Sequence, residues 1–372
     1  MQEAFYRNVT YFRTQRLLTA KKWVKLYMFS DEQFMQRAIQ LALLGGISVA
    51  PNPMVGAVIV HNNRIIGEGY HQVFGSAHAE VNAVNAVEDQ SLLSESTIYV
   101  TLEPCAHFGK TPPCANLLVQ KQFKRVVIGT IDPFAKVAGQ GVRILQEAGI
   151  ECTVGVLEAE CQEVNKRFFT FHQQQRPYII LKWAQTADGF IDADRNNNET
   201  GEIRWISSPD TQALVHQWRA EEHAILVGWK TVLNDNPSLT VRAVSGKNPI
   251  RVIIDSQLQA PKTATVFTDG LPTIVFNTIR EGHEGSVQYV QLSDCSVENQ
   301  LKALHQLNII SVFIEGGNYT LQQYIDSGNW DETRVIVGTN RFGSGIKAPV
   351  IGRIPSKTYT FATDTIHTFS RS

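Results

Sequence analysis

Short apolar runs alternate with helical segments along almost the whole chain, and this alternation restricts the fold to the α/β class. In the first half the pattern predicts strands over residues 55–60, 64–70, 97–102, 125–130 and 151–156, and helices over 31–44, 78–87, 141–148 and 157–175, with another from about Pro113. In the second half it predicts strands over 178–183, 250–255, 273–276, 309–315 and 334–337, and helices over 209–222 and 297–307. We therefore expect a three-layer α/β/α unit around a mixed sheet, followed by a second α/β unit.

The chain has 372 residues, more than one ordinary hydrophobic core accommodates. A polar run ends at the helix-stopping Pro177, and we place the domain boundary there. This predicts an N-terminal extension over 1–27, a first domain over 28–173 and a second over 174–372. The extension is basic and superficially resembles a targeting peptide. Because Ser30 and the acids after it predict a helix N-terminus, we interpret the extension as an appendage.

The charge balance argues against nucleic acid and membrane as partners. The formal net charge is −1, so no overall positive field attracts the chain to either. No apolar stretch is long enough to span a membrane, and no signal peptide is evident, which predicts a cytosolic location. The five cysteines are an odd number at irregular spacing, which favours metal or core roles over disulfides. We expect a small-molecule substrate.

One group of residues has the pattern of a catalytic zinc site. His78 and Glu80 belong to a His-Ala-Glu triplet, and Cys105 and Cys114 follow farther along the chain. One histidine and two cysteines leave the fourth tetrahedral position of zinc open for water, as a catalytic site requires. Zinc acidifies that water, and a nearby carboxylate can move protons. A histidine near an acid is often only a surface pair, but with Pro-Cys after a strand it matches the zinc deaminase signature. We predict that His78, Cys105 and Cys114 bind one zinc ion and that Glu80 is catalytic.

The spacing of the cysteines narrows the family. Eight residues, Ala-His-Phe-Gly-Lys-Thr-Pro-Pro, separate them, and further motifs are Pro-Asn-Pro-Met-Val-Gly at 51–56, Gly-Glu-Gly-Tyr-His at 67–71 and Asp-Pro at 132–133. With these motifs the chain resembles the bifunctional riboflavin-biosynthesis deaminase and reductase of bacteria over roughly residues 30–365. The resemblance implies a cytidine-deaminase-like first domain, a dihydrofolate-reductase-like second domain, zinc and NADPH as cofactors, and a homo-oligomer.

The resemblance also implies a substrate pocket in the first domain for a pyrimidine and its ribose phosphate. The residues that would line it are Asn52, His71, His107, Lys110 and Thr111. Two of them have simpler interpretations. Asn52 lies between prolines and could merely shape a turn, and His71 could be a buried structural histidine.

The second domain has weaker motifs of its own. Glu-Gly-Gly-Asn at 315–318 lies between an apolar run and a helix, where backbone amides can receive a phosphate, although two glycines more often mark only a tight turn. The resemblance implies a reductase that uses NADPH to convert the ribosyl group to ribityl. The implied substrate residues are Ile203, Arg219, Leu239, Arg242 and Glu315, with the two arginines as phosphate ligands. The implied cofactor residues are Ala184, Trp205, Thr231, Asp235, Ser256, Gly317, Asn318, Tyr319 and Thr320.

Three positions depart from the family pattern. Ile203 replaces the usual serine, Phe134-Ala135 replaces the usual Asn-Pro, and the chain stops at Ser372. The early stop predicts the loss of an edge strand and a less stable reductase half.

The leading hypothesis is therefore deamination of a phosphoribosylaminopyrimidine followed by reduction of its sugar. One alternative is a nucleoside or nucleic-acid deaminase with an unrelated appended domain. The cysteine spacing and the absence of basic charge count against it. The other is a nonenzymatic nucleotide-binding scaffold, against which Glu80 argues because zinc binding alone does not need it.

Overall fold

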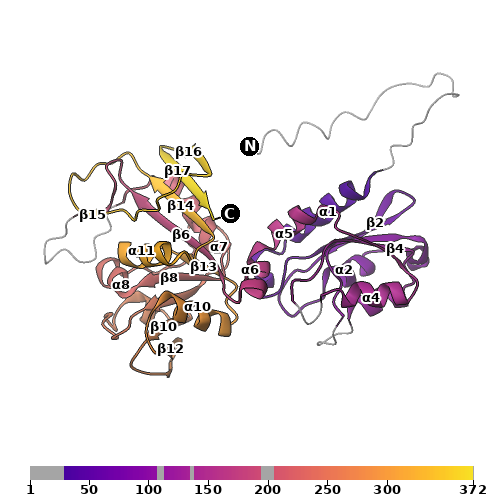
Figure 1. Ribbon diagram of the computed structural model, residues 1–372, viewed down its shortest axis with the longest axis horizontal. Helices are drawn as coiled ribbons and strands as arrows, with labels where there is room; N and C mark the ends of the chain where they lie inside the picture. Colours follow the sequence, from indigo (N-terminus) through magenta and orange to yellow (C-terminus); the bar gives the residue numbers. More distant parts are fainter. Residues whose placement is uncertain (1–28, 107–112, 135–137, 194–204, 372) are drawn as a thin grey trace, which may run out of the picture.

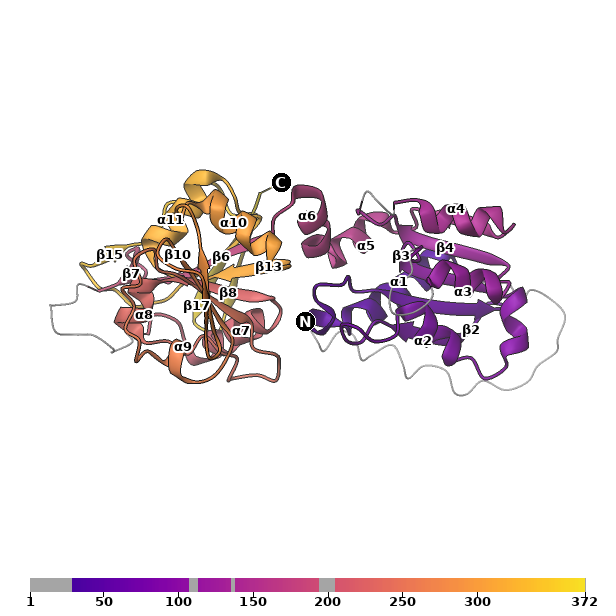
Figure 2. The same cartoon turned by 90° about the horizontal axis from the view of Figure 1, so that it is seen from below.

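The computed structural model describes residues 29–106, 113–134, 138–193 and 205–371. Two α/β domains lie side by side, and helix α6 (Lys166–Gln174) lies where they meet (Figures 1 and 2). The extension over 1–27 lies outside the described residues. None of the helices in the described ranges combines the length and the apolar character that crossing a membrane demands.

The first domain has the predicted three layers. Its sheet has the strand order β2-β1-β3-β4-β5, formed by β1 (Gly56–His61), β2 (Arg64–Tyr70), β3 (Thr97–Leu102), β4 (Arg125–Thr130) and β5 (Glu151–Val154). Strand β1 runs antiparallel to β2 and β3, whereas β3, β4 and β5 are parallel, so the sheet is mixed. One face packs against α1 (Asp31–Leu43) and α5 (Glu158–Val164). The other packs against α2 (Ala79–Asn85), α3 (Cys114–Gln120) and α4 (Gln140–Glu147).

The period-two pattern of β1 explains why both faces are covered. Ala57 and Ile59 belong to the cluster under α2 to α4, while Val58 and Val60 belong to the cluster under α1 and α5. Because successive side chains of a strand point to opposite faces, an apolar run without alternation needs a layer on each side. The uninterrupted apolar run of β1 thus explains why helices cover this strand on both faces of the sheet.

The close packing of α2 on β2 depends on Gly69. A Cβ at this position would lie 2.3 Å from the backbone nitrogen of Ala83 and 2.5 Å from the carbonyl oxygen of Ala79, both in α2. Helix α2 carries Glu80, so the distance between α2 and β2 also determines how deeply the Glu80 carboxyl group is buried.

We expect Gly69→Ala to lower the free energy of unfolding by roughly 1–3 kcal/mol, because the helix must move away from the strand. Denaturant unfolding would measure the change, with Ser94→Ala at an exposed position as the control. Equal stability of the two variants would contradict this account of the packing.

The structure divides one predicted helix into two. The sequence pattern predicted a single helix over 157–175, but α5 ends at Val164 and α6 begins at Lys166. Between them Asn165 has φ −106° and ψ 21°, outside the helical region. Its side chain instead bonds the backbone of Met54. The prediction of one continuous helix was therefore wrong, because a tertiary contact overrides local helix propensity here.

The second domain is built on a ten-stranded sheet among the described residues. Its strand order is β11-β12-β10-β9-β8-β13-β6-β14-β17-β16. The strands are β6 (Tyr178–Gln185), β8 (Ala224–Gly228), β9 (Ile250–Ile254), β10 (Thr273–Asn277), β11 (Gly282–Glu284), β12 (Val287–Gln291), β13 (Ser311–Ile314), β14 (Glu332–Val337), β16 (Lys357–Phe361) and β17 (Asp364–Ser370). The helices are α7 (Pro209–Ala220), α8 (Trp229–Asp235), α9 (Thr265–Thr268), α10 (Val297–Gln306) and α11 (Asn318–Ser327). A separate small sheet pairs β7 (Phe190–Asp192) with β15 (Ile346–Lys347).

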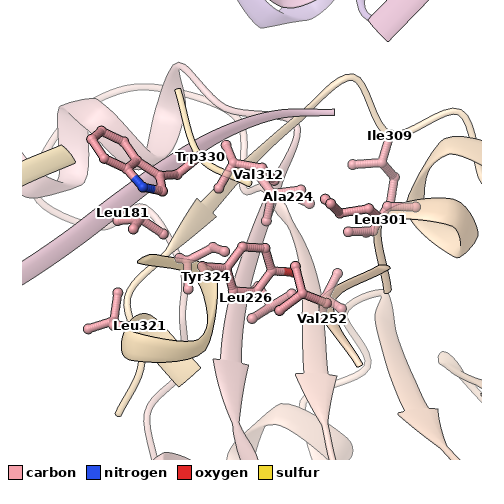
Figure 3. Packing of buried hydrophobic residues seen from close by; sticks show 14 of the residues in the cluster. Leu181, Ala224, Leu226, Val252, Leu301, Ile309, Val312, Leu321, Tyr324 and Trp330 are labelled. Atoms are coloured by element: carbon pink, nitrogen blue, oxygen red, sulfur yellow. The ribbon is translucent and has the colours of Figure 1, made fainter. Parts of the chain in front are cut away.

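The largest core cluster of this domain lies between the sheet and helices α10 and α11, and further clusters involve α7, α8 and α9. Figure 3 shows Tyr324 of α11 against strand residues such as Leu226 and Val252. The Tyr324 hydroxyl donates a hydrogen bond of 2.9 Å to Gln300 Oε1 in α10, so its polar end is satisfied inside the core. Strand β17 pairs with β14 from Thr365 to Ser370.

Candidate zinc centre and reductase pocket

Three residues from separate elements form a metal-binding group in the first domain. His78 directly precedes α2, Cys105 follows strand β3, and Cys114 is the first residue of α3. Their ligand atoms lie within 4.8 Å of one another, with His78 Nδ1 3.5 Å from Cys105 Sγ and 3.4 Å from Cys114 Sγ. A tetrahedral zinc ion, with bonds of about 2.3 Å to sulfur and about 2.0 Å to nitrogen, holds such atoms roughly 3.5 Å apart. The three residues therefore fit zinc.

Glu80 lies in the first turn of α2, and its side chain is buried beside these ligands. Burial raises the pKa of its carboxyl group to about 7, and the negative charge of Cys105 acts in the same direction. A group with a pKa near neutrality can both accept and release a proton at physiological pH.

Cys105 has the opposite environment. Hydrogen bonds from Cys114 and His78 lower the pKa of its thiol, despite partial burial. The backbone N–H of Cys114 also donates to Cys105 Sγ at 3.3 Å. The thiolate is the form that binds metal, so these contacts prepare Cys105 as a ligand.

Asn52 and His71, two of the predicted substrate residues, lie beside the metal-binding group. The His71 and His78 rings have centroids 5.4 Å apart. Asn52 Nδ2 lies 3.2 Å from His71 Nε2, and His71 Nδ1 lies 3.1 Å from the carbonyl oxygen of Ala77. Burial lowers the pKa of His71. The Ala77 carbonyl oxygen can only accept, so Nδ1 donates to it, and Asn52 Nδ2 can only donate, so Nε2 accepts from it. The predicted residues His107, Lys110 and Thr111 lie outside the described residues.

The second domain contains a cavity of about 370 Å³. The predicted substrate residues that line it are Arg219, Leu239, Arg242 and Glu315, and the predicted cofactor residues that line it are Trp205, Thr231 and Asp235. Ile203 lies outside the described residues. The remaining cofactor predictions, which are Ala184, Ser256, Gly317, Asn318, Tyr319 and Thr320, do not belong to the lining of this cavity.

Arg219 and Glu315 form a buried ion pair inside this cavity. Arg219 donates from Nε to Glu315 Oε1 at 2.5 Å and from Nη2 to Oε2 at 2.8 Å. Lys182 Nζ lies 3.6 Å from the same carboxylate. Although burial opposes ionisation, the charges of Arg219 and Lys182 lower the pKa of Glu315 to about 2. The cavity therefore contains a buried cluster of charged groups, in which burial lowers the pKa of Lys182. Arg242 donates instead to the hydroxyl groups of Ser238 and Thr240.

Two glycines lead into the start of α11, next to this cavity. A Cβ at Gly316 would lie 2.6 Å from Val227 Cβ in β8, and Gly317 has φ +64°, so both positions need glycine. Among the described residues, Asn318 Oδ1 is buried and has no hydrogen-bond partner. Free amides at a helix start and an unused polar atom fit the phosphate and hydroxyl groups of a dinucleotide.

Comparisons with known proteins identify both halves. Residues 28–130 match the family model described as the cytidine and deoxycytidylate deaminase zinc-binding region, and residues 177–370 match the RibD C-terminal domain. The riboflavin biosynthesis protein RibD of Aquifex aeolicus is 41% identical over 330 residues, which are 87% of this chain and 90% of that protein. The chain belongs to the RibD family. RibD of Escherichia coli is 35% identical over 84% of this chain and 89% of its own length.

Solved structures agree with this family. The diaminohydroxyphosphoribosylaminopyrimidine deaminase/5-amino-6-(5-phosphoribosylamino)uracil reductase of Thermotoga maritima matches with a TM-score of 0.82 at 38% identity. The match covers 91% of this chain and 98% of that one. RibD of Acinetobacter baumannii has the same TM-score at 32% identity, covering 91% of this chain and 98% of its own. This RibD family member is therefore a bifunctional deaminase and reductase of riboflavin biosynthesis that uses zinc and NADPH.

Two residues to which the sequence analysis gave no role lie at the RibD sites. Lys182 is the charged residue in the mostly apolar strand β6, and that contrast was the available signal. Glu103 precedes Pro104 and Cys105, and its carboxylate accepts four backbone N–H groups, from Asp132, Gly139, Gly141 and Val142. The carboxylate thereby connects the segment that precedes Cys105 to the start of α4 by hydrogen bonds.

Proposed function

We propose that the zinc centre deaminates 2,5-diamino-6-(5-phosphoribosylamino)pyrimidin-4(3H)-one and that the second cavity reduces the ribosyl group of the product to ribityl. The observation that carries this proposal is the pairing of buried Glu80 with the His78, Cys105 and Cys114 group in a chain with a second charged cavity. Deamination needs a proton carrier beside an activated water, and sugar reduction needs a separate cofactor site.

Deamination rests on Glu80 and its neighbours. Zinc, when bound by His78 and the two cysteines, would lower the pKa of a water molecule and so supply the nucleophile. Glu80 takes a proton from that water and transfers it to the ring nitrogen of the pyrimidine, while the hydroxide bonds to the ring carbon that carries the amine. Glu80 then takes the second proton from this new hydroxyl group and gives it to the amine, so that ammonia departs as the C–N bond breaks and a C=O bond forms. Asn52 and His71 bind the pyrimidine. The loop residues His107, Lys110 and Thr111 are assigned to the same substrate by the resemblance.

Reduction rests on the charged cavity. NADPH supplies the hydride that C1 of the opened ribosyl group receives, and the glycines before α11 bind its phosphate. The guanidinium group of Arg242 donates to hydroxyl groups, and no described carboxylate pairs with it, so its cationic charge is available to the substrate phosphate. Arg219 is paired with Glu315. We therefore propose that Arg219 both binds the phosphate and orients the Glu315 carboxylate. The other positions predicted for substrate and cofactor, including Ile203, keep their roles as proposals.

The remaining proposals concern organisation. We divide the chain into an extension over 1–27, a deaminase domain over 28–173 and a reductase domain over 174–372, since α6 ends at Gln174, one residue past the boundary between the two domains. We place the enzyme in the cytosol as a homo-oligomer that acts on small molecules and not on nucleic acid. The net charge of −1 supports the last point.

Removal of zinc with a chelator tests the separation of the two sites. We expect metal-depleted protein to lose ammonia release and to keep NADPH-dependent reduction of pre-deaminated substrate, because the metal ligands and the charged cavity belong to different domains. Added Zn²⁺ restores deamination. Deamination by metal-depleted protein, or parallel loss of both activities, would contradict the proposal.

A further inference from the structure

We infer that Asn165 is a positioning residue for deamination, because it holds the loop that presents Asn52 to the substrate. The inference rests on the proposed function, in which Asn52 is a substrate ligand. Asn165 lies between α5 and α6 and is 111 positions from Met54 in the sequence. Its side chain hydrogen-bonds these distant segments together, and Val55 of the same loop packs against a cluster that includes Phe168 and Phe169 of α6.

The side-chain amide of Asn165 hydrogen-bonds both backbone groups of Met54, the pattern that a residue of a neighbouring β-strand forms. Its Nδ2 donates to the Met54 carbonyl oxygen at 2.8 Å, and its Oδ1 accepts from the Met54 N–H at 2.8 Å. Both backbone groups of Met54 are thus satisfied by one amide side chain, which is 2% exposed. Loss of that side chain would leave the backbone donor and acceptor of Met54 without these partners at a largely water-excluded position.

The loop held at Met54 leads directly into the deaminase site. Asn52 lies two residues before Met54, and its side chain contacts His71 Nε2 at 3.2 Å. Val55 follows Met54, and its carbonyl oxygen accepts a hydrogen bond of 2.9 Å from the His71 N–H. Met54 is therefore flanked by two residues that contact His71. A shift of Met54 changes the position of Asn52 relative to the zinc ligands.

Asn165 is itself fixed by the second domain. Two residues farther on, Arg167 forms a buried bidentate pair with Glu222, which follows α7. Lys166 lies 3.6 Å from Glu332 of β14. The start of α6 is therefore anchored to the reductase domain on one side and to the Met54 loop on the other. A cavity of about 310 Å³ between them is lined by both segments, including Asn52, Met54, Asn165 and Arg167.

The test compares Asn165→Ala and Asn165→Asp with the control Gln162→Ala. Gln162 belongs to α5 but contacts Thr130 and Glu158 instead of the loop. We expect both Asn165 variants to lower kcat/KM for deamination by roughly 10-fold to 100-fold, mainly through a higher KM, because small misplacements of binding groups have effects of this size. The aspartate variant keeps the size of the side chain and an acceptor for the Met54 N–H, but its carboxylate cannot donate to the Met54 carbonyl.

Zinc content and reduction of pre-deaminated substrate separate positioning from general damage. We expect zinc content and reductase activity in the two Asn165 variants to match those of the wild type while their KM for deamination is raised. The Gln162 control should match the wild type in every assay. Wild-type KM in both Asn165 variants would overturn the inference, as would loss of zinc or of reductase activity in step with deamination. Absence of ammonia release from the wild-type enzyme would overturn the proposed function itself and the inference with it.

Discussion

Replacing Glu80 with glutamine is expected to lower ammonia release by roughly 10²-fold to 10⁴-fold, the usual contribution of a positioned proton carrier. The amide keeps the size of the side chain but cannot move a proton between water, ring nitrogen and leaving amine. Zinc should remain bound, because Glu80 is not one of the three ligands in the metal-binding group. Reduction of pre-deaminated substrate should be unchanged.

Three measurements on the same protein check this prediction. They are ammonia release, zinc content and NADPH oxidation with pre-deaminated substrate. Glu88→Gln is a matched control, because it makes the same change at an exposed position just beyond α2. Full ammonia release by the Glu80 variant would refute its catalytic role, and loss of zinc would show that the residue acts through the metal site.

Replacing Arg219 with methionine is expected to lower NADPH-dependent reduction by roughly 100-fold, because Glu315 would lose the guanidinium group that orients it and small misplacements at a reacting site have effects of this size. Glu315 would keep Lys182 at 3.6 Å but would lose both short hydrogen bonds from the guanidinium group. Its pKa should rise, and its carboxylate would no longer be held in place. Deamination should remain near the wild-type rate, since the zinc centre belongs to the other domain.

The matched control is Arg280→Met, which breaks an ion pair with Glu284 on a more exposed surface. Such pairs contribute little to stability, so reduction should be unaffected. Denaturant unfolding of both variants would show whether the Arg219 effect is local to the cavity. Near-normal reduction in the Arg219 variant would contradict the role given to the pair.

The zinc centre could be predicted because its chemistry is concentrated in short motifs. His78 and Glu80 are two residues apart, and Cys105 and Cys114 flank a distinctive spacer. Ligand types and spacing are sufficient to indicate the metal before the fold is known. Placement of the two cysteines at the end of β3 and the start of α3 was expected from the predicted elements and is observed.

Features determined by distant contacts could not be predicted. The break at Asn165 depends on Met54, and the role of Glu103 depends on backbone N–H groups between 132 and 142. Strand β8, a central strand, was also missed, because a short apolar run after a helix has no period of its own that separates strand from helix. The resemblance implied Arg219 and Glu315 as two substrate residues, but it did not indicate that each is the partner of the other.

The most direct test of two successive reactions at two sites is mass spectrometry of the products formed from the diaminopyrimidine substrate, with and without NADPH. Without NADPH, we expect replacement of one amino group by oxygen and release of ammonia. With NADPH, we expect the same product to gain two hydrogens on its sugar. A substrate that stays unchanged under both conditions, or one that is never reduced after deamination, would contradict the account.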